Sequence, residues 1–143
     1  MSSVFSKILS GELPASFVYR DDKVSAFMDI QPVNPGHVLL IPNQETQFLH
    51  ELQDDVCEYL MKIAKRISKA IRGSGIKCEG IGVFMADGEV AGQEVPHVHL
   101  HIFPRFKDDG FGFKHPESYF KLPPRSELDE AAKKIRVALE KLV

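Results

Sequence analysis

Three of the six histidines in the sequence stand at alternate positions of one short segment, HVHLHIF at residues 97–103. The segment is apolar enough for a β-strand, in which successive side chains point to opposite faces of the sheet. His97, His99 and His101 are therefore expected on one face, with the apolar residues between them directed into the core. This pattern predicts three imidazoles side by side, where one phosphate could meet them together.

Such a row of imidazoles fits three interpretations: an ordinary solvated face, a metal site, or a catalytic site. Alternate residues of a strand lie about 6.6–7 Å apart, so the outer two Cα atoms are about 13 Å apart. Closing three such rings on one ion at about 2.1 Å would strain the strand. A metal would therefore take two of these histidines and a more distant ligand.

Nucleophilic catalysis on phosphorus accounts for more of the surrounding sequence. Neutral imidazole is a good nucleophile at about pH 7, and a covalent intermediate divides one difficult displacement into two easier ones. Neighbouring histidines can hydrogen-bond phosphate oxygens and protonate a leaving group. Gly88 and Gly92 precede the row and allow backbone N–H groups to approach an anion, and His37 begins another predicted strand.

The bulk composition is that of a folded domain without a general attraction for nucleic acid or membranes. The chain has 143 residues, 43% of them hydrophobic and 27% charged, and a formal net charge of −2. Any phosphate must therefore be held by a few placed donors rather than by a basic surface. Cys57 and Cys78 are too few for a disulfide framework. With no signal segment or membrane span evident, we expect a cytoplasmic protein.

The elements that must position the histidines are short strands and two helices. A long helix is predicted over 55–72, beginning at a capping box of Asp55 and Glu58, and a final helix is predicted from Ser126. Strands grouped with few helices between them favour an α+β fold with an antiparallel sheet. The predicted strands cover residues 16–20, 23–30, 37–42, 80–86 and 96–103.

The segment HVHLHIF fits the His-φ-His-φ-His-φ-φ signature (φ is apolar) of the histidine-triad family of nucleotide hydrolases and transferases. The preceding stretches SKILSGELPASFVYRDDKVSAFMDIQPVNPGHVLLIP and DGEVAGQEVP also resemble that family, so the resemblance covers residues 3 to about 105. It implies an antiparallel sheet of about five strands with one long central helix, continued across a homodimer. We expect the core at 1–106, with a tail and C-terminal helix at 107–143 that wrap over the same domain.

The resemblance implies roles for four histidines. His99 would be the nucleophile that attacks an α-phosphate to form a nucleotidyl-histidine, and the backbone carbonyl of His97 would fix its tautomer. His101 would hydrogen-bond the phosphate and assist the departure of the leaving group. His37 would lie at the floor of the pocket, linked to the triad.

The same resemblance implies a nucleotide pocket around the triad. Asp29 would accept hydrogen bonds from both ribose hydroxyls, and Phe27 and Ile30 would flank the base. Each position also suits an ordinary structural residue, in a turn, in the core or in a solvated loop. The residues expected to cradle the phosphate, through backbone N–H groups and one amide, are Gln93, Glu94 and Val95.

Several positions depart from the family pattern. Many members bind zinc through two cysteines near the N-terminus, a later histidine and the first histidine of the triad. Ser3, Ser6 and Glu45 stand at the first three of these positions, and because serine is a poor zinc ligand we expect no structural zinc. Ala86 replaces an amide residue of the nucleotide pocket, which removes a hydrogen bond worth about 1 kcal/mol. Glu94 stands beside the leaving group, where an ionised carboxylate cannot donate a hydrogen bond.

The sequence therefore predicts a nucleotidyl hydrolase or transferase that cleaves a purine nucleoside monophosphate, AMP in the first instance, from NMP–X substrates. The substrate would be a phosphoramidate or a dinucleoside polyphosphate. No cofactor or metal is required of the protein, because a histidine supplies the nucleophile, although magnesium can accompany a polyphosphate substrate. The alternative is a nucleotide-binding regulatory protein with residual catalysis, which Ala86 favours and the intact triad opposes.

Overall fold

The computed structural model describes residues 2–142. The chain forms two compact units, Met1–Phe111 and Gly112–Val143. The first unit contains every residue that the sequence predicts for the site.

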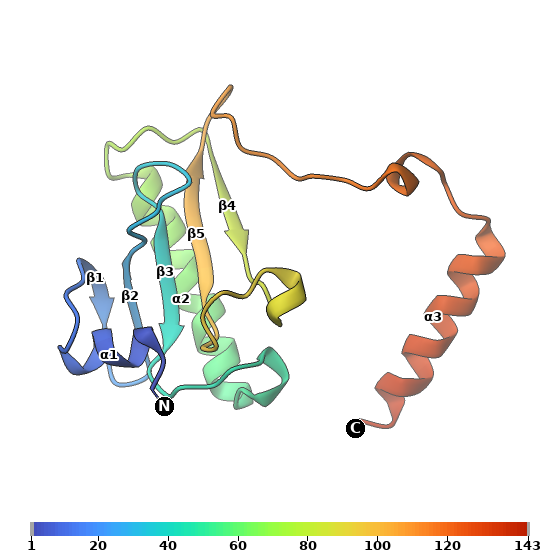
Figure 1. Ribbon diagram of the computed structural model, residues 1–143, viewed down its shortest axis with the longest axis horizontal. Coiled ribbons are helices and arrows are strands. Elements are labelled where there is room, and N and C mark those ends of the chain that lie inside the picture. The colour runs from blue at the N-terminus through green and yellow to red at the C-terminus, as the bar shows by residue number, and fades with distance from the viewer. Residues whose placement is uncertain (1, 143) are drawn as a thin grey trace. The chain divides into compact units, whose positions relative to one another are not determined.

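In the part of the chain that the structure describes, the first unit is built on one antiparallel sheet of five strands (Figure 1). Their order across the sheet is β1-β2-β3-β5-β4, and every neighbouring pair is antiparallel. The predicted α+β fold is confirmed. The strands are β1 (Phe17–Arg20), β2 (Val24–Met28), β3 (Val38–Pro42), β4 (Gly80–Phe84) and β5 (Leu100–Arg105).

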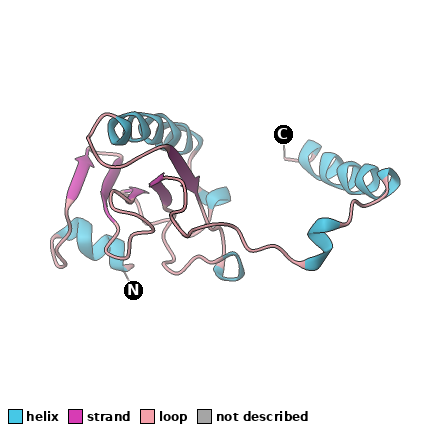
Figure 2. Cartoon of the chain, turned by 90° about the horizontal axis from the view of Figure 1, so that it is seen from above, coloured by secondary structure: helices cyan, strands magenta, loops and turns pink. Residues whose placement is uncertain are grey.

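The alternation of side chains along the strands separates two hydrophobic clusters, one on each face of the sheet. Leu40 of β3 packs in the cluster that contains the buried side of the long helix α2 (Asp54–Arg72). Its neighbour Leu39 packs in the cluster of Phe5, which belongs to the short helix α1 (Val4–Ser10). Figure 2 shows the long helix on one side of the strands and the short N-terminal helix on the other. The site residues lie on the α1 side.

The long helix begins without the predicted capping box. α2 begins at Asp54, after Gln53, whose side chain makes no capping hydrogen bond, and Asp55 lies inside the first turn. Two carboxylates in the first turn interact favourably with the partial positive charge of the helix N-terminus, which explains why the helix extends one residue further. The capping-box prediction was wrong, whereas the predicted end of the helix at Arg72 is confirmed.

The strand that carries the histidines begins later than predicted. β5 begins at Leu100, so His101 lies on the strand while His97 and His99 lie in the segment before it. The pairing with β3 reaches Leu100 opposite Leu40 and goes no further. Pro42 ends β3 and has no N–H to continue the ladder, so the chain leaves the sheet at this point.

The second unit contains the predicted C-terminal helix, α3 (Arg125–Glu140). Before this helix, the ring of His115 stacks on Tyr119 with 3.9 Å between the centroids. The wrapping of residues 107–143 over the core stays a prediction. Among residues 2–142, no helix has both the length and the apolar character needed to cross a membrane.

Candidate active site

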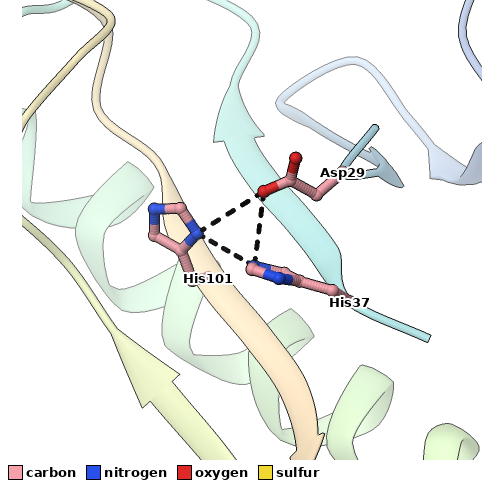
Figure 3. Close-up of side chains that lie close together, drawn as sticks. All are labelled: Asp29, His37 and His101. Atoms are coloured by element: carbon pink, nitrogen blue, oxygen red, sulfur yellow. Dashed lines mark hydrogen bonds and ion pairs between the residues drawn. The ribbon is translucent and has the colours of Figure 1, made fainter. Parts of the chain in front are cut away.

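The register of the sheet gathers three polar side chains on the face opposite α2. His101 pairs with Leu39, and the backbone N–H of Asp29, just after β2, donates to the carbonyl of His37 at 2.9 Å. His37 and Leu39 are two residues apart, so their side chains point to the same face as His101. Figure 3 shows the side chains of Asp29, His37 and His101 converging.

The ring of His99 is held in one tautomer. Its Nδ1 lies 2.7 Å from the carbonyl oxygen of His97. A carbonyl oxygen only accepts hydrogen bonds, so Nδ1 carries the proton and Nε2 keeps a free lone pair. His99 is 5% exposed, and the ring of Phe5 packs edge-on against it with 5.0 Å between centroids. His99 therefore presents an unprotonated nitrogen in the geometry that the resemblance implies for the nucleophile.

The ring of His97 is completely buried, and both of its nitrogens have partners. Nε2 lies 2.8 Å from the carbonyl oxygen of Pro42, and Nδ1 lies 2.8 Å from the hydroxyl of Ser3. The structure therefore corrects the expectation that three imidazoles meet one phosphate. His97 contributes its backbone carbonyl to the site, while its ring is not available to a phosphate because both nitrogens are bonded and the residue is 0% exposed.

His37 and His101 share a hydrogen bond whose direction is set by the backbone. The N–H of Val33 donates to Nδ1 of His37 at 3.0 Å, so the proton of His37 is on Nε2. This Nε2 then donates to Nδ1 of His101 at 3.0 Å. His101 must therefore carry its own proton on Nε2, where it can be donated to a phosphate oxygen or a leaving group.

Asp29 lies beside this pair of histidines. Its Oδ2 is 3.5 Å from Nε2 of His37 and 3.9 Å from Nδ1 of His101, which is also the spacing of metal ligands. His37 does not fit a metal, because its Nδ1 faces the N–H of Val33 and its Nε2 must keep the proton. Such a donor set favours a hydrogen-bonded pair over a metal centre. That the protein needs no metal stays a prediction.

Burial lowers the pKa of His37, His97, His99 and His101 below the ordinary value of 6.5. The effect is large for His101, whose pKa falls to about 4 because burial is reinforced by His99 and His37. The carboxylate of Asp29 acts in the opposite direction without offsetting burial. Near neutral pH the site therefore holds neutral imidazoles, one with a free lone pair and one with a free N–H.

The loop before the histidines presents two backbone donors. Gly88, with a φ of 104°, donates its N–H to Oε1 of Gln93, and Nε2 of Gln93 donates to the carbonyl of Gln47, both at 2.8 Å. The amide of Gln93 is thus engaged in shaping the loop. Among the described residues, no hydrogen bond occupies the N–H groups of Glu94 and Val95. These two N–H groups are the ones left for a phosphate.

The residues predicted for the base do not line an open slot together. Phe27 is 2% exposed and packs with Phe5 and Leu39, a position that suits the core. Ile30 is 94% exposed and lies beyond this cluster. Ala86 is buried and has no side-chain hydrogen-bonding group, so it does not supply the hydrogen bond of the amide residue that the family pattern has at this position.

The residues at the zinc-binding positions of the family come together as a hydrogen-bonded cluster. The hydroxyl of Ser6 donates to Glu45 at 2.8 Å, and the backbone N–H of Ser3 donates to the same carboxylate oxygen. The hydroxyl of Ser3 bonds to Nδ1 of His97. Two of the four groups are serine hydroxyls, and the histidine nitrogen already has a partner, so this cluster does not fit zinc.

Two contacts to the site come from groups that the sequence did not indicate. The ring of Phe5 packs against His99, and the N–H of Val33 sets the tautomer of His37. In the sequence, Phe5 is recognisable only as an apolar residue of an amphipathic helical turn, which predicts burial but no contact with the site. A backbone N–H leaves no signal in the residue type at all.

Comparison with known proteins shows the family of the chain. The model of the HIT domain family matches residues 10–108. The chain belongs to the HIT family. The resemblance to histidine-triad proteins is thereby confirmed, and the matched range includes the four histidines and the loop at 88–95.

Relatives of this HIT protein match most of its length. An uncharacterized HIT-like protein from Borreliella burgdorferi is 46% identical over 112 residues, which are 78% of this chain and 81% of that protein. The purine nucleoside phosphoramidase of Escherichia coli is 35% identical over 100 residues, 70% of this chain and 84% of that protein. The crystal structure of a histidine triad nucleotide-binding protein from Candida albicans has a TM-score of 0.86 at 29% identity, covering 99% of this chain and 100% of that chain.

Proposed function

We propose that this HIT protein is a nucleotidyl hydrolase that cleaves NMP–X through a nucleotidyl-histidine intermediate on His99. The observation that carries the proposal is the fixed tautomer of His99, with Nδ1–H bonded to the carbonyl of His97 and Nε2 free. A nucleophilic imidazole needs a free lone pair and donors that stabilise the charge on the phosphate. The unoccupied N–H groups of Glu94 and Val95 supply such donors.

The proposed reaction consists of two displacements. In the first, Nε2 of His99 bonds to the α-phosphorus and the bond from phosphorus to X breaks. The anionic phosphate and Asp29 favour a proton on the pair formed by His37 and His101, and Nε2 of His101 passes that proton to X. In the second, water attacks the phosphorus, its proton returns to His101, and the bond to His99 breaks to release the nucleoside monophosphate.

The substrate that we propose is a purine nucleoside phosphoramidate, with AMP as the product that is released. The relative from Escherichia coli is named a purine nucleoside phosphoramidase, and a solved relative is named a nucleotide-binding protein. Oδ1 of Asp29 accepts only from the N–H of Gln31 among the described residues, so the carboxylate keeps lone pairs for ribose hydroxyls. Dinucleoside polyphosphates are the second substrate class to compare.

The test is AMP release from adenosine phosphoramidate, diadenosine tri- and tetraphosphate, and an adenylated amino acid. His99→Ala is compared with wild type and with His50→Ala, whose exposed ring stacks on Phe48 outside the site. We expect release by wild type and His50→Ala alone, with no loss of phosphoramidate turnover in EDTA. If no protein releases AMP from the panel while all bind it, the hydrolase proposal fails and the nucleotide-binding alternative replaces it.

We also propose a cytoplasmic homodimer in which β4 continues the sheet into a second copy. β4 lies at the edge of the sheet, and Val83 and Phe84 are 50% and 42% exposed. An exposed apolar edge strand is a natural site for pairing with another chain. Sedimentation should show a dimer for wild type and for Ile30→Glu, and a shift toward monomer for Val83→Glu. A monomeric wild type would contradict the dimer.

A further inference from the structure

Ser3 lies in sequence far from the triad, yet it contacts the first histidine directly. It is the N-cap of α1, where its Oγ accepts a hydrogen bond from the N–H of Ser6 at 3.0 Å. The same oxygen lies 2.8 Å from Nδ1 of His97, and Ser3 is 6% exposed. One buried hydroxyl therefore joins the N-terminal helix to the histidine segment.

The direction of the bond between Ser3 and His97 follows from the other side of the ring. Nε2 of His97 faces the carbonyl oxygen of Pro42, which can only accept, so the proton of the neutral ring is on Nε2. Nδ1 is then an acceptor, and the Ser3 hydroxyl donates to it. With both nitrogens bonded and the residue 0% exposed, the ring of His97 cannot turn over without leaving a buried group unpaired.

The carbonyl of His97 is the group that sets the tautomer of His99. The residue that carries this carbonyl is held from two sides: the N–H of Val98, in the same peptide group, donates to the carbonyl of Thr46 at 2.7 Å, and the Ser3 hydroxyl restrains the ring of His97. We propose that Ser3 is a positioning residue for the nucleophile: its hydroxyl holds His97, whose carbonyl holds Nδ1–H of His99 and leaves Nε2 free. This role rests on the proposed function of His99, although the hydrogen-bond chain itself does not.

Substitution of Ser3 should lower turnover more than substrate binding. Without the hydroxyl, Nδ1 of His97 is left unpaired in a buried place, the peptide after His97 shifts, and the bond to His99 loosens. We expect Ser3→Ala to lower kcat about tenfold while KM changes less than about twofold. Ser3→Thr keeps a hydroxyl and should restore kcat. Ser10→Ala is the matched control, because the Ser10 hydroxyl lies at the other end of the same helix and its hydrogen bonds, to the carbonyl of Lys7 and from the N–H of Glu12, are local and exposed.

The tautomers can be read directly by ¹⁵N NMR of histidine-labelled protein without any substrate. In wild type we expect the proton of His97 on Nε2 and that of His99 on Nδ1. In Ser3→Ala we expect His97 to keep its proton on Nε2, because the Pro42 carbonyl still accepts it, and the assignment of His99 to become mixed. If Ser3→Ala does not fold, Ser3→Cys replaces it, since a thiol is a weaker donor of similar size.

Two results would overturn the proposal: a wild-type His97 that carries its proton on Nδ1, or a folded Ser3 variant with unchanged tautomers and unchanged kcat. The NMR result stands even if wild type releases no AMP from any substrate, so failure of the hydrolase proposal is distinguishable from failure of this one.

Discussion

His97 and His99 are buried and each has a tautomer fixed by its surroundings, whereas His37 and His101 bond to one another beside a carboxylate. The first two residues are 0% and 5% exposed, and a carbonyl oxygen accepts from each ring. In the second pair, the side chain of His101 is 22% exposed and Asp29 lies within 3.9 Å. His97 and His99 thus form a rigid half. In the other half the ring of His101 is open to proton exchange, while its partner His37 is 2% exposed.

This difference matches the two requirements of a displacement at phosphorus. A nucleophilic nitrogen must not be protonated, and burial with a fixed tautomer keeps Nε2 of His99 free. A group that protonates the leaving group must gain and lose protons, which a solvent-reachable ring with a neighbouring imidazole and carboxylate can do. Substitutions in the two halves should therefore have different signatures.

The largest effect is expected from His99→Ala. Removing the nucleophile should lower kcat for AMP release by at least about 10³-fold, and by a similar factor for good and poor leaving groups. Single-turnover assays with a phosphoramidate and a p-nitrophenyl ester of AMP measure this. A loss confined to one substrate would show that His99 protonates the leaving group. That result would contradict the proposal that His99 is the nucleophile and His101 the proton donor.

A smaller and selective effect is expected from His101→Ala. For a poor leaving group that needs a proton, kcat should fall about 10²-fold, and for p-nitrophenolate less than about tenfold. The ratio of the two rates is the measurement, because a general loss of structure would lower both equally. Equal losses would contradict the assignment of His101 to the leaving group.

The acidic side of the pH profile of kcat/KM should report the protonation of His99. The neutral form of His99 is the active one, and burial lowers its pKa below 6.5, so with p-nitrophenolate as the leaving group activity should hold at pH 6.5 and fall at lower pH. A leaving group that needs a proton takes it from the protonated pair of His37 and His101, whose pKa values burial also lowers, so with such a substrate kcat/KM should in addition decline as pH rises. An acidic midpoint at or above 6.5 would mean that His99 is not protected from protonation.

The smallest effect is expected outside both halves, in the loop that presents the phosphate donors. Gln93→Ala removes the bonds to Gly88 and Gln47 and should raise KM about three- to tenfold with little change in kcat. Gln53→Ala, at an exposed position before α2, is the control. A change in kcat larger than that in KM would place Gln93 in the chemical step.

The sequence predicted the type of each element better than its ends. Alternating apolar residues and the stripe of α2 identify strands and helix, because these periodicities are local. The loss of strand structure at His97 and His99 depends on Pro42 in a neighbouring strand, which the segment itself does not show. The three rings still lie on the α1 side, where Phe5 contacts His97 and His99 and the ring of His99 contacts that of His101. The expectation fails only for the ring of His97, whose two nitrogens are already bonded.

The sequence predicted those residues of the site that can be recognised by their type and their position in a motif. The histidines and Asp29 were found from the motif and the family resemblance. The bond between Ser3 and His97 joins residues 94 positions apart, and the tautomer of His37 depends on the N–H of Val33. Contacts of this kind follow from sheet register and helix placement, so one sequence does not reveal them.

The most direct test of the covalent mechanism is the stereochemical course at phosphorus. An AMP ester made chiral by sulfur is hydrolysed by wild type in ¹⁸O-labelled water, and the configuration of the product is determined. Two in-line displacements through His99 invert the phosphorus twice, so we expect net retention. Net inversion would mean that water attacks directly, and it would contradict a nucleotidyl-histidine intermediate.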